Sequence, residues 1–333
     1  MRILHVSNRP DIRAFKQALV MLDRGHQVEV AAPTESFGIN YYTRACLFGD
    51  NAQLTRTIQE SIADVIHVHS DPNWLIPLVK GAAGSRPVIH DVHDPESMRA
   101  GMAPDAHELE AFKVADALIH VSEACRAHSE KTHGAGKPTE IIHSAVPRRF
   151  YDAARNANFN ALVYQGGLTS RFTDTDGLAY YRNMLYVVEQ FKKEDYSVSL
   201  FAAGHDEIDH SYERIGAFLT RNLFYTTMLT GLRLHGFGFV GSPVVTPIIK
   251  GAMPNKLFEY ISQGVVPICW NAEEAGEFVT KHGIGFHLHG ELLNLREQLK
   301  DAYKVRERLL KVRNDLAMES QAEKLERFYR SLI

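Results

Sequence analysis

Cysteine is scarce in this chain, which has only three among 333 residues. Cys46, Cys125 and Cys269 are odd in number, far apart and without CxxC spacing. This pattern excludes a disulfide-stapled scaffold and a cysteine zinc site, because both need closely and regularly spaced cysteines. It predicts reduced thiols in a cytoplasmic protein.

Long hydrophobic runs and an excess of one charge are also missing. No apolar run approaches the roughly 20 residues of a membrane span, and the polar-interrupted N-terminus is typical of a strand rather than a signal peptide. A net charge of −3 gives no global electrostatic reason to expect nucleic acid or an anionic membrane. The 45% hydrophobic and 23% charged residues describe a soluble globular protein, and the length predicts two domains.

Short β-branched segments alternate with segments of helical period, which predicts an α/β protein with parallel sheets. The expected strands lie near 2–7, 27–32, 65–69, 88–92, 117–121 and 140–143, and then near 161–165, 198–202, 265–269 and 285–288. Expected helices include 15–24, 54–63 and 178–191, and the sequence is mostly helical from 292 onward. The polar stretch 154–158 interrupts the pattern and predicts a linker.

One segment, MPNKLFEY at 253–260, combines a helix start with two charges. Pro254 suits a first helical position, where free N–H groups favour a bound anion, and Lys256 adds a positive charge. Glu259 lies on the same helix face, where its carboxylate can accept hydrogen bonds from a ribose diol. A capped amphipathic helix with solvated charges explains the spacing equally well. Spacing alone therefore leaves both interpretations open.

The longer stretch PNKLFEYISQGVVPI resembles the nucleotide-sugar motif of GT-B glycosyltransferases, especially the PNKLFEY-type subgroup of the large retaining family 4. Further segments resemble that family in the expected order: RILHVS, RGHQVEVAAP, ADVIHVHS, PVIHDVHD, ADALIHVSEA, IIHSAVPRRFY and ALVYQGGLTSR. The resemblance implies two facing Rossmann-like domains with parallel sheets. Residues 1–153 would form the acceptor domain, 159–312 the nucleotide-sugar domain, and 313–333 a helix packing back onto the first domain.

The resemblance also implies a set of donor-binding residues in the second domain. They are Gly166, Gly167, Arg171, Pro254, Asn255, Lys256, Leu257 and Glu259. The two glycines would let the backbone approach a pyrophosphate, although an ordinary glycine turn explains them too. Segment 236–243 falls where a loop of the family contacts the base. Two positions depart from the family pattern: Gly167 replaces a common arginine, and Gly251 replaces the first of two common glutamates.

In the first domain the family places a histidine near the donor sugar or acceptor, and His93 occupies that position. Asp94 is the other candidate base, so the expected catalytic set is His93, Asp94, Arg171 and Lys256. Asp11 and Arg13 follow the first strand on the acceptor side, where Arg13 would meet an anionic group or simply start a surface helix.

Two patterns of histidine and acidic residues could form a metal-binding site. His67 and His69 share a strand face, while His90, Asp91, His93 and Asp94 gather at the next strand end. GT-B enzymes generally work without a bound metal and no HExxH or Cys/His spacing is present, so the expectation is no metal and no cofactor. The triplet Asp174 to Asp176 matches a metal-binding motif of another glycosyltransferase fold, but its place before a helical run favours capping.

The expected function is transfer of a sugar from a nucleotide diphosphate to an acceptor hydroxyl, with retention, in glycan or glycoconjugate biosynthesis. UDP is a candidate carrier, but the sequence does not identify the base or the sugar of the donor. The acceptor would be a glycan, a lipid-linked sugar, a small molecule, or a hydroxymethylated base in DNA, and peripheral membrane contact stays open. DNA would need a basic face, for which the candidates are Arg9, Arg13, Arg44 and Arg99. A sugar-nucleotide epimerase is the alternative enzyme. A non-catalytic nucleotide-sugar-binding protein is a third class, motivated by Gly167 and Gly251.

Overall fold

The computed structural model describes residues 1–8, 12–35, 37–69, 72–171, 181–203, 208 and 210–333. The chain divides into two compact units. Unit 1 comprises Met1–Pro147 and Met318–Ile333, and unit 2 comprises Arg148–Ala317. The predicted linker at 154–158 lies within unit 2, where residue 158 already begins a strand.

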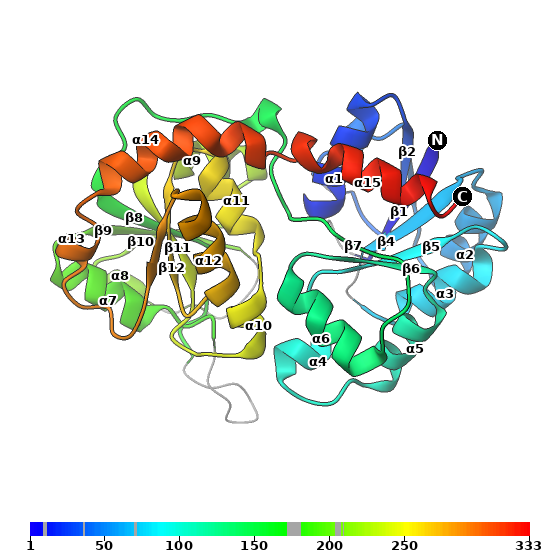
Figure 1. Cartoon of the computed structure of the whole chain (residues 1–333), viewed down its shortest axis with the longest axis horizontal. Coiled ribbons are helices and arrows are strands. Elements are labelled where there is room, and N and C mark those ends of the chain that lie inside the picture. Colours follow the sequence, from blue (N-terminus) through cyan, green and yellow to red (C-terminus); the bar gives the residue numbers. More distant parts are fainter. Residues whose placement is uncertain (9–11, 36, 70–71, 172–180, 204–207, 209) are drawn as a thin grey trace. The chain divides into compact units, whose positions relative to one another are not determined.

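Unit 1 contains a seven-stranded parallel sheet in the order β3-β2-β1-β4-β5-β6-β7 (Figure 1). Its strands are β1 (Arg2–Ser7), β2 (Gln27–Ala32), β3 (Arg44–Leu47), β4 (Val65–His69), β5 (Val88–Val92), β6 (Ala117–His120) and β7 (Thr139–Ile141). Its helices are α1 (Ile12–Asp23), η1 (Ile39–Tyr41), α2 (Asn51–Glu60), α3 (Leu75–Ala82), α4 (Glu96–Ala100), α5 (Ala106–Val114), α6 (Glu123–His133) and α15 (Glu319–Arg330). Strands β4, β5 and β6 are buried along their whole length, as expected for a parallel sheet covered on both faces.

Unit 2 contains a six-stranded parallel sheet in the order β10-β9-β8-β11-β12-β13. Its strands are β8 (Asn158–Gly166), β9 (Ser197–Ala202), β10 (Phe218–Arg221), β11 (His235–Gly241), β12 (Val266–Trp270) and β13 (Phe286–Leu288). Its helices are η2 (Arg148–Phe150), α7 (Leu185–Lys193), α8 (Ser211–Arg214), α9 (Tyr225–Leu232), α10 (Pro247–Gly251), α11 (Asn255–Ser262), α12 (Glu273–His282), α13 (Leu295–Gln298), α14 (Ala302–Val312) and η3 (Arg313–Leu316). The two parallel sheets confirm the predicted α/β class.

Strand β11 corrects one expectation, because segment 236–243 was assigned to a loop. The strand runs between β8 and β12 in the middle of the sheet. Its glycines allow close packing. A Cβ at Gly236 would lie 2.7 Å from the carbonyl oxygen of Asn158, and one at Gly238 would lie 2.5 Å from the Tyr260 ring. Small residues let the backbone of a neighbouring strand and a helix side chain approach this strand closely.

The C-terminal helix α15 belongs to unit 1 and packs against α1 (Figure 1). Glu326 on α15 forms an ion pair with Arg24, which follows α1. Among the described residues, no helix is long and apolar enough to cross a membrane. None of the cysteines Cys46, Cys125 and Cys269, all of which the structure describes, forms a disulfide.

Candidate functional site

The end of β8 and the first turn of α11 meet in unit 2 at Gly166 and Lys256. Gly166 has a φ of 139°, a conformation that favours glycine. A Cβ at this position would lie 3.0 Å from Lys256 Nζ, so the missing side chain leaves room for the ammonium group. The structure therefore brings together two predicted donor-binding residues that are far apart in sequence, at the carboxyl end of a parallel strand where such folds bind ligands.

Lys256 is partly buried and lies over an aromatic ring. Its Nζ is 4.0 Å from the ring centroid of Tyr164, and the Tyr164 hydroxyl donates a hydrogen bond to the Gly167 carbonyl oxygen at 3.0 Å. Burial, reinforced by the nearby charge of Arg182 and opposed by Glu259, lowers the pKa of Lys256 to about 7. The lysine thus lies close to the balance between charged and neutral, where an added anion favours the charged form.

Glu259 lies one turn deeper on α11 and is 1% exposed. Burial, together with the neighbouring charge of Glu259, raises the pKa of Tyr225 of α9 well above its usual range. The next residue, Tyr260, has a structural role: its hydroxyl accepts from the Gln165 N–H at 3.0 Å and lies 3.3 Å from the Phe239 carbonyl oxygen. Glu259 therefore provides a buried carboxylate one turn into α11, whereas the Tyr260 hydroxyl contacts the backbone of β8 and β11.

The other residues singled out in the second domain also belong to unit 2. Pro254 has a ψ of 154° and precedes the helix, which begins at Asn255, so the expectation that it occupies the first helical position is wrong. Leu257 is completely buried, so its side chain belongs to the core. Arg171 is exposed, and its carbonyl oxygen accepts from Asn183 Nδ2 at 3.0 Å. Gly251 ends α10 and is buried.

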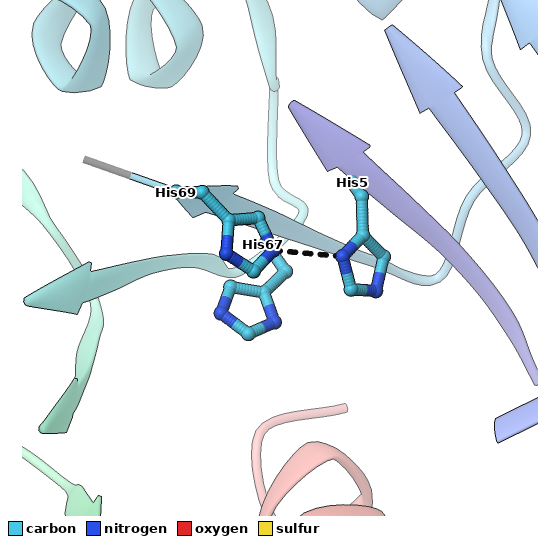
Figure 2. A group of neighbouring side chains, drawn as sticks. All are labelled: His5, His67 and His69. Atoms are coloured by element: carbon cyan, nitrogen blue, oxygen red, sulfur yellow. Dashed lines mark hydrogen bonds between the residues drawn. The ribbon is translucent and has the colours of Figure 1, made fainter. Parts of the chain in front are cut away.

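In unit 1, three histidines lie side by side on one sheet face (Figure 2). His5 on β1 pairs with His67 on β4, and His69 follows two residues later on the same face. His5 Nδ1 lies 2.8 Å from His69 Nε2, within hydrogen-bonding distance. Burial, with an added contribution from His67, lowers the pKa of both His5 and His69 well below its usual range. These two rings are therefore neutral at physiological pH.

Asp91 on β5 is the charged centre of this cluster. It is fully buried and accepts hydrogen bonds from Arg13 Nε at 2.9 Å and Gln17 Nε2 at 3.0 Å, and lies 3.2 Å from His67 Nε2. Burial alone would raise its pKa, but the Arg13 charge and the contact with His67 hold the pKa well below its usual range. Arg13 is 2% exposed and also donates to Ser144 Oγ, so its charge is matched inside unit 1.

The histidine cluster has atoms close enough for a metal, with possible ligand atoms within 4.8 Å of one another. Its rings do not converge, however: His67 and His69 stack with centroids 4.3 Å apart at 22°, and His5 and His69 stack at 16°. Both nitrogens of His67 already have partners, Tyr329 and Asp91. A second such cluster, Glu273, His287 and His289, lies in unit 2. The absence of a required metal stays an expectation.

The remaining first-domain candidates follow β5 or β1. His93 is partly buried, with a buried Nδ1 that has no hydrogen-bond partner among the described residues, and Asp94 beside it is exposed. His90 was grouped with them but points to the other sheet face, where its ring lies 5.1 Å from that of Phe112. Asp11 and Arg9 lie outside the described residues, as does the triplet 174–176 of the second domain.

Three residues near these sites were not predicted from the sequence. Tyr164 precedes Gly166 by two positions on β8, so the two residues lie on the same face of the strand. This spacing could have identified Tyr164 as a neighbour of the site. Tyr225 and Arg182 reach the start of α11 from other elements, and no sequence spacing connects them to it.

Comparison with known proteins agrees with this geometry. The model of Glycosyltransferase Family 4 matches residues 12–150. The fold is similar to that of Anabaena HepE solved with UDP-glucose, at a TM-score of 0.72 and 12% identity with all of both chains covered. It is also similar to sucrose-phosphate synthase from Thermosynechococcus elongatus, at a TM-score of 0.69 and 11% identity over 98% of each chain. An alpha-glucosyltransferase solved with UDP and DNA containing an HMU base gives a TM-score of 0.60 and 13% identity, over 100% of this chain and 95% of that one. No curated protein matches the sequence. The chain is a glycosyltransferase with the GT-B fold, and its residues 12–150 match the Glycosyltransferase Family 4 model.

Proposed function

We propose that this glycosyltransferase takes its sugar from a UDP-linked donor held by unit 2 and passes it to an acceptor hydroxyl held by unit 1. The observation that carries the proposal is the arrangement on α11, where Lys256 lies beside the glycine at the end of β8 and Glu259 lies one turn deeper. A cation next to an open backbone suits a diphosphate, and a buried carboxylate suits a ribose diol. HepE and the alpha-glucosyltransferase were both solved with uridine nucleotides, which supports UDP as the carrier.

The proposed reaction retains the anomeric configuration. The bond between the sugar carbon and the diphosphate oxygen breaks, the acceptor oxygen bonds to the same face of that carbon, and the departing phosphate oxygen takes the acceptor proton. The protein then mainly stabilises negative charge on the phosphate, a role that suits Lys256 and Arg171. His93 would contact the sugar or acceptor, and its buried Nδ1 without a partner supports a polar role. No metal or cofactor takes part.

A thermal-shift panel with UDP, GDP, ADP, TDP and their sugars tests the donor. A ligand at 100 times its Kd stabilises the native state by about 2.7 kcal/mol, so UDP compounds should raise the melting temperature most. Slow hydrolysis of UDP-glucose should accompany binding. Stabilisation without hydrolysis or transfer would indicate a binding protein, and an epimeric sugar nucleotide would indicate an epimerase.

Coupling constants of the new glycosidic bond, measured by NMR, test retention. An inverted product, together with near-total loss of turnover in Asp94→Asn, would move the base to unit 1 and reject the retaining route.

Modified DNA is the alternative acceptor, because the alpha-glucosyltransferase with a similar fold was solved with DNA. The structure weakens the expected basic face: Arg13 is buried against Asp91 and does not reach the surface, while Arg44 is exposed. Sugar transfer to hydroxymethylated DNA and salt-sensitive DNA binding would support this acceptor, and the absence of both would remove it. A glycan, lipid-linked or small-molecule hydroxyl is the favoured class, and peripheral membrane contact remains compatible with it.

A further inference from the structure

Gly167 stands where the family resemblance implies an arginine, and the structure shows what the glycine makes possible. A Cβ built on Gly167 would lie 3.0 Å from Cδ, Nε and Cζ of Arg182. The φ of Gly167 is not in the left-handed region, so its backbone conformation does not require glycine. The glycine therefore provides room for the Arg182 side chain, which occupies the space that a side chain at 167 would fill.

The backbone around Arg182 is fixed by hydrogen bonds on both sides. The Arg182 carbonyl oxygen accepts from the Thr169 N–H at 3.3 Å. On one side, Ser242 Oγ donates to the Tyr181 carbonyl oxygen at 2.6 Å, and on the other, the Met184 N–H donates to the Tyr212 hydroxyl at 2.9 Å. A side chain on a backbone held in this way is positioned before a ligand arrives, which reduces the cost of binding.

Two positive groups lie close together as a result. Arg182 is near enough to Lys256 for its charge to contribute to lowering the lysine pKa, second to burial. An anion bound at this point would favour the charged form of Lys256. A diphosphate is such an anion, and a guanidinium matches the geometry of phosphate oxygens with paired donors.

We infer that Arg182 replaces the missing arginine of position 167 and binds the diphosphate of the donor beside Lys256. The inference rests on the proposed function and adds a phosphate-binding residue from another part of the chain. Charge neutralisation at the leaving group then comes from Arg182 together with Lys256 and Arg171.

Isothermal titration of the full chain with UDP, uridine and inorganic pyrophosphate tests this role. Arg182→Ala should weaken UDP and pyrophosphate by about tenfold to a hundredfold, and leave uridine unchanged. Arg214→Ala, which removes an exposed arginine from α8, is the matched control and should change none of the three. Arg182→Gln retains most of the side-chain bulk and gives the same test if the alanine variant folds poorly.

The transposed variant Gly167→Arg with Arg182→Ala makes the test specific. It returns the guanidinium to position 167 and removes the side chain that would block it, so pyrophosphate affinity should recover to within about threefold of wild type. Equal loss of uridine and pyrophosphate binding, or unchanged pyrophosphate affinity in a folded Arg182→Ala, would overturn the role of Arg182. Failure of the wild type to bind either UDP or pyrophosphate would instead reject the proposed function, and this inference with it.

Discussion

The hydroxyl of Tyr329 lies 2.7 Å from Nδ1 of His67, joining residues 262 positions apart in unit 1. Tyr329 is on α15 and is fully buried, and burial raises its pKa well above the usual range. His67 in turn contacts Asp91, which is paired with Arg13 on α1. The last helix of the chain is therefore attached to the polar centre of the first sheet.

Tyr329→Phe should destabilise unit 1, because it leaves the buried His67 Nδ1 without its partner. The expected loss is about 1–3 kcal/mol of unfolding free energy. Tyr303→Phe is the control, since Tyr303 is 71% exposed. Urea unfolding, followed by hydrogen exchange of peptides from β4 and α15, measures the difference. An equal loss of unfolding free energy in Tyr329→Phe and Tyr303→Phe would show that the contact between Tyr329 and His67 does not stabilise unit 1.

The stability of unit 1 should fall in mild acid. Burial lowers the pKa of His90 to about 3 and of His120 to about 4, and those of His5 and His69 also lie well below 6.5. Below pH 6.5 the unfolded chain therefore binds protons before the folded chain does, and stability decreases until the folded pKa is reached. Each neutral buried histidine contributes a slope of about 1.4 kcal/mol per pH unit. Asp91 adds a loss only below its unfolded pKa, near 3.8.

His90→Leu tests this pH dependence with little structural damage. Both ring nitrogens of His90 are buried without partners among the described residues, so an apolar replacement loses no hydrogen bond there. Between pH 7.5 and 5, the unfolding free energy of His90→Leu should depend on pH less steeply than that of the wild type, by up to about 1.4 kcal/mol per pH unit. His210→Gln, at a side chain 85% exposed, should keep the wild-type slope. An unchanged slope in His90→Leu would show that this histidine is not held neutral.

Gly166→Ala should displace the Lys256 ammonium, because the new Cβ would lie 3.0 Å from its nitrogen. The expected result is a loss of UDP affinity of about tenfold or more, as for one charged hydrogen bond. Gly136→Ala is matched for backbone strain: its φ is 118°, compared with 139° for Gly166, but nothing lies within 4 Å of its Cβ. Calorimetric titration with UDP compares them. A similar affinity in both variants would show that strain, not crowding of Lys256, causes any change.

Binding of UDP should be accompanied by proton uptake above neutral pH. With a pKa of about 7, Lys256 is mostly neutral at pH 8 before the ligand arrives, and a bound diphosphate favours its charged form. Affinity should therefore decrease as pH rises from 7 to 9. Titrations at pH 8 in HEPES and in Tris give the number of protons taken up, since UDP is then fully ionised itself. The same number in Lys256→Gln would assign the uptake to another group.

Strands rich in β-branched residues were predictable, and β11 shows why others were not. β1, β4 and β5 have the expected bounds, whereas HGFGFVG lacks β-branched bulk at most positions and resembles a loop. Its glycines accommodate the Tyr260 ring and the backbone of β8, contacts that arise only after folding. The edge strands β3 and β10 are short and largely exposed, so they leave little hydrophobic pattern.

Some residues of the candidate site were likewise predictable from the sequence, and others were not. Lys256 and Gly166 were predictable as neighbours, because one starts a helix and the other ends a parallel strand. Arg182 was not, since its place beside Gly167 depends on hydrogen bonds from Thr169 and other residues of unit 2. Arg13 was expected on the acceptor surface, but the buried carboxylate of Asp91 pairs with it inside unit 1.

The ribose contact of Glu259 tests most directly whether α11 holds a nucleotide diphosphate. The full chain and its Glu259→Ala variant are titrated with UDP and with 2′,3′-dideoxy-UDP, which lacks the diol. The account predicts that the variant binds UDP about tenfold or more weakly than wild type, whereas the dideoxy compound binds both proteins equally. Unchanged UDP affinity in a folded variant, or the same loss for both ligands, would contradict it.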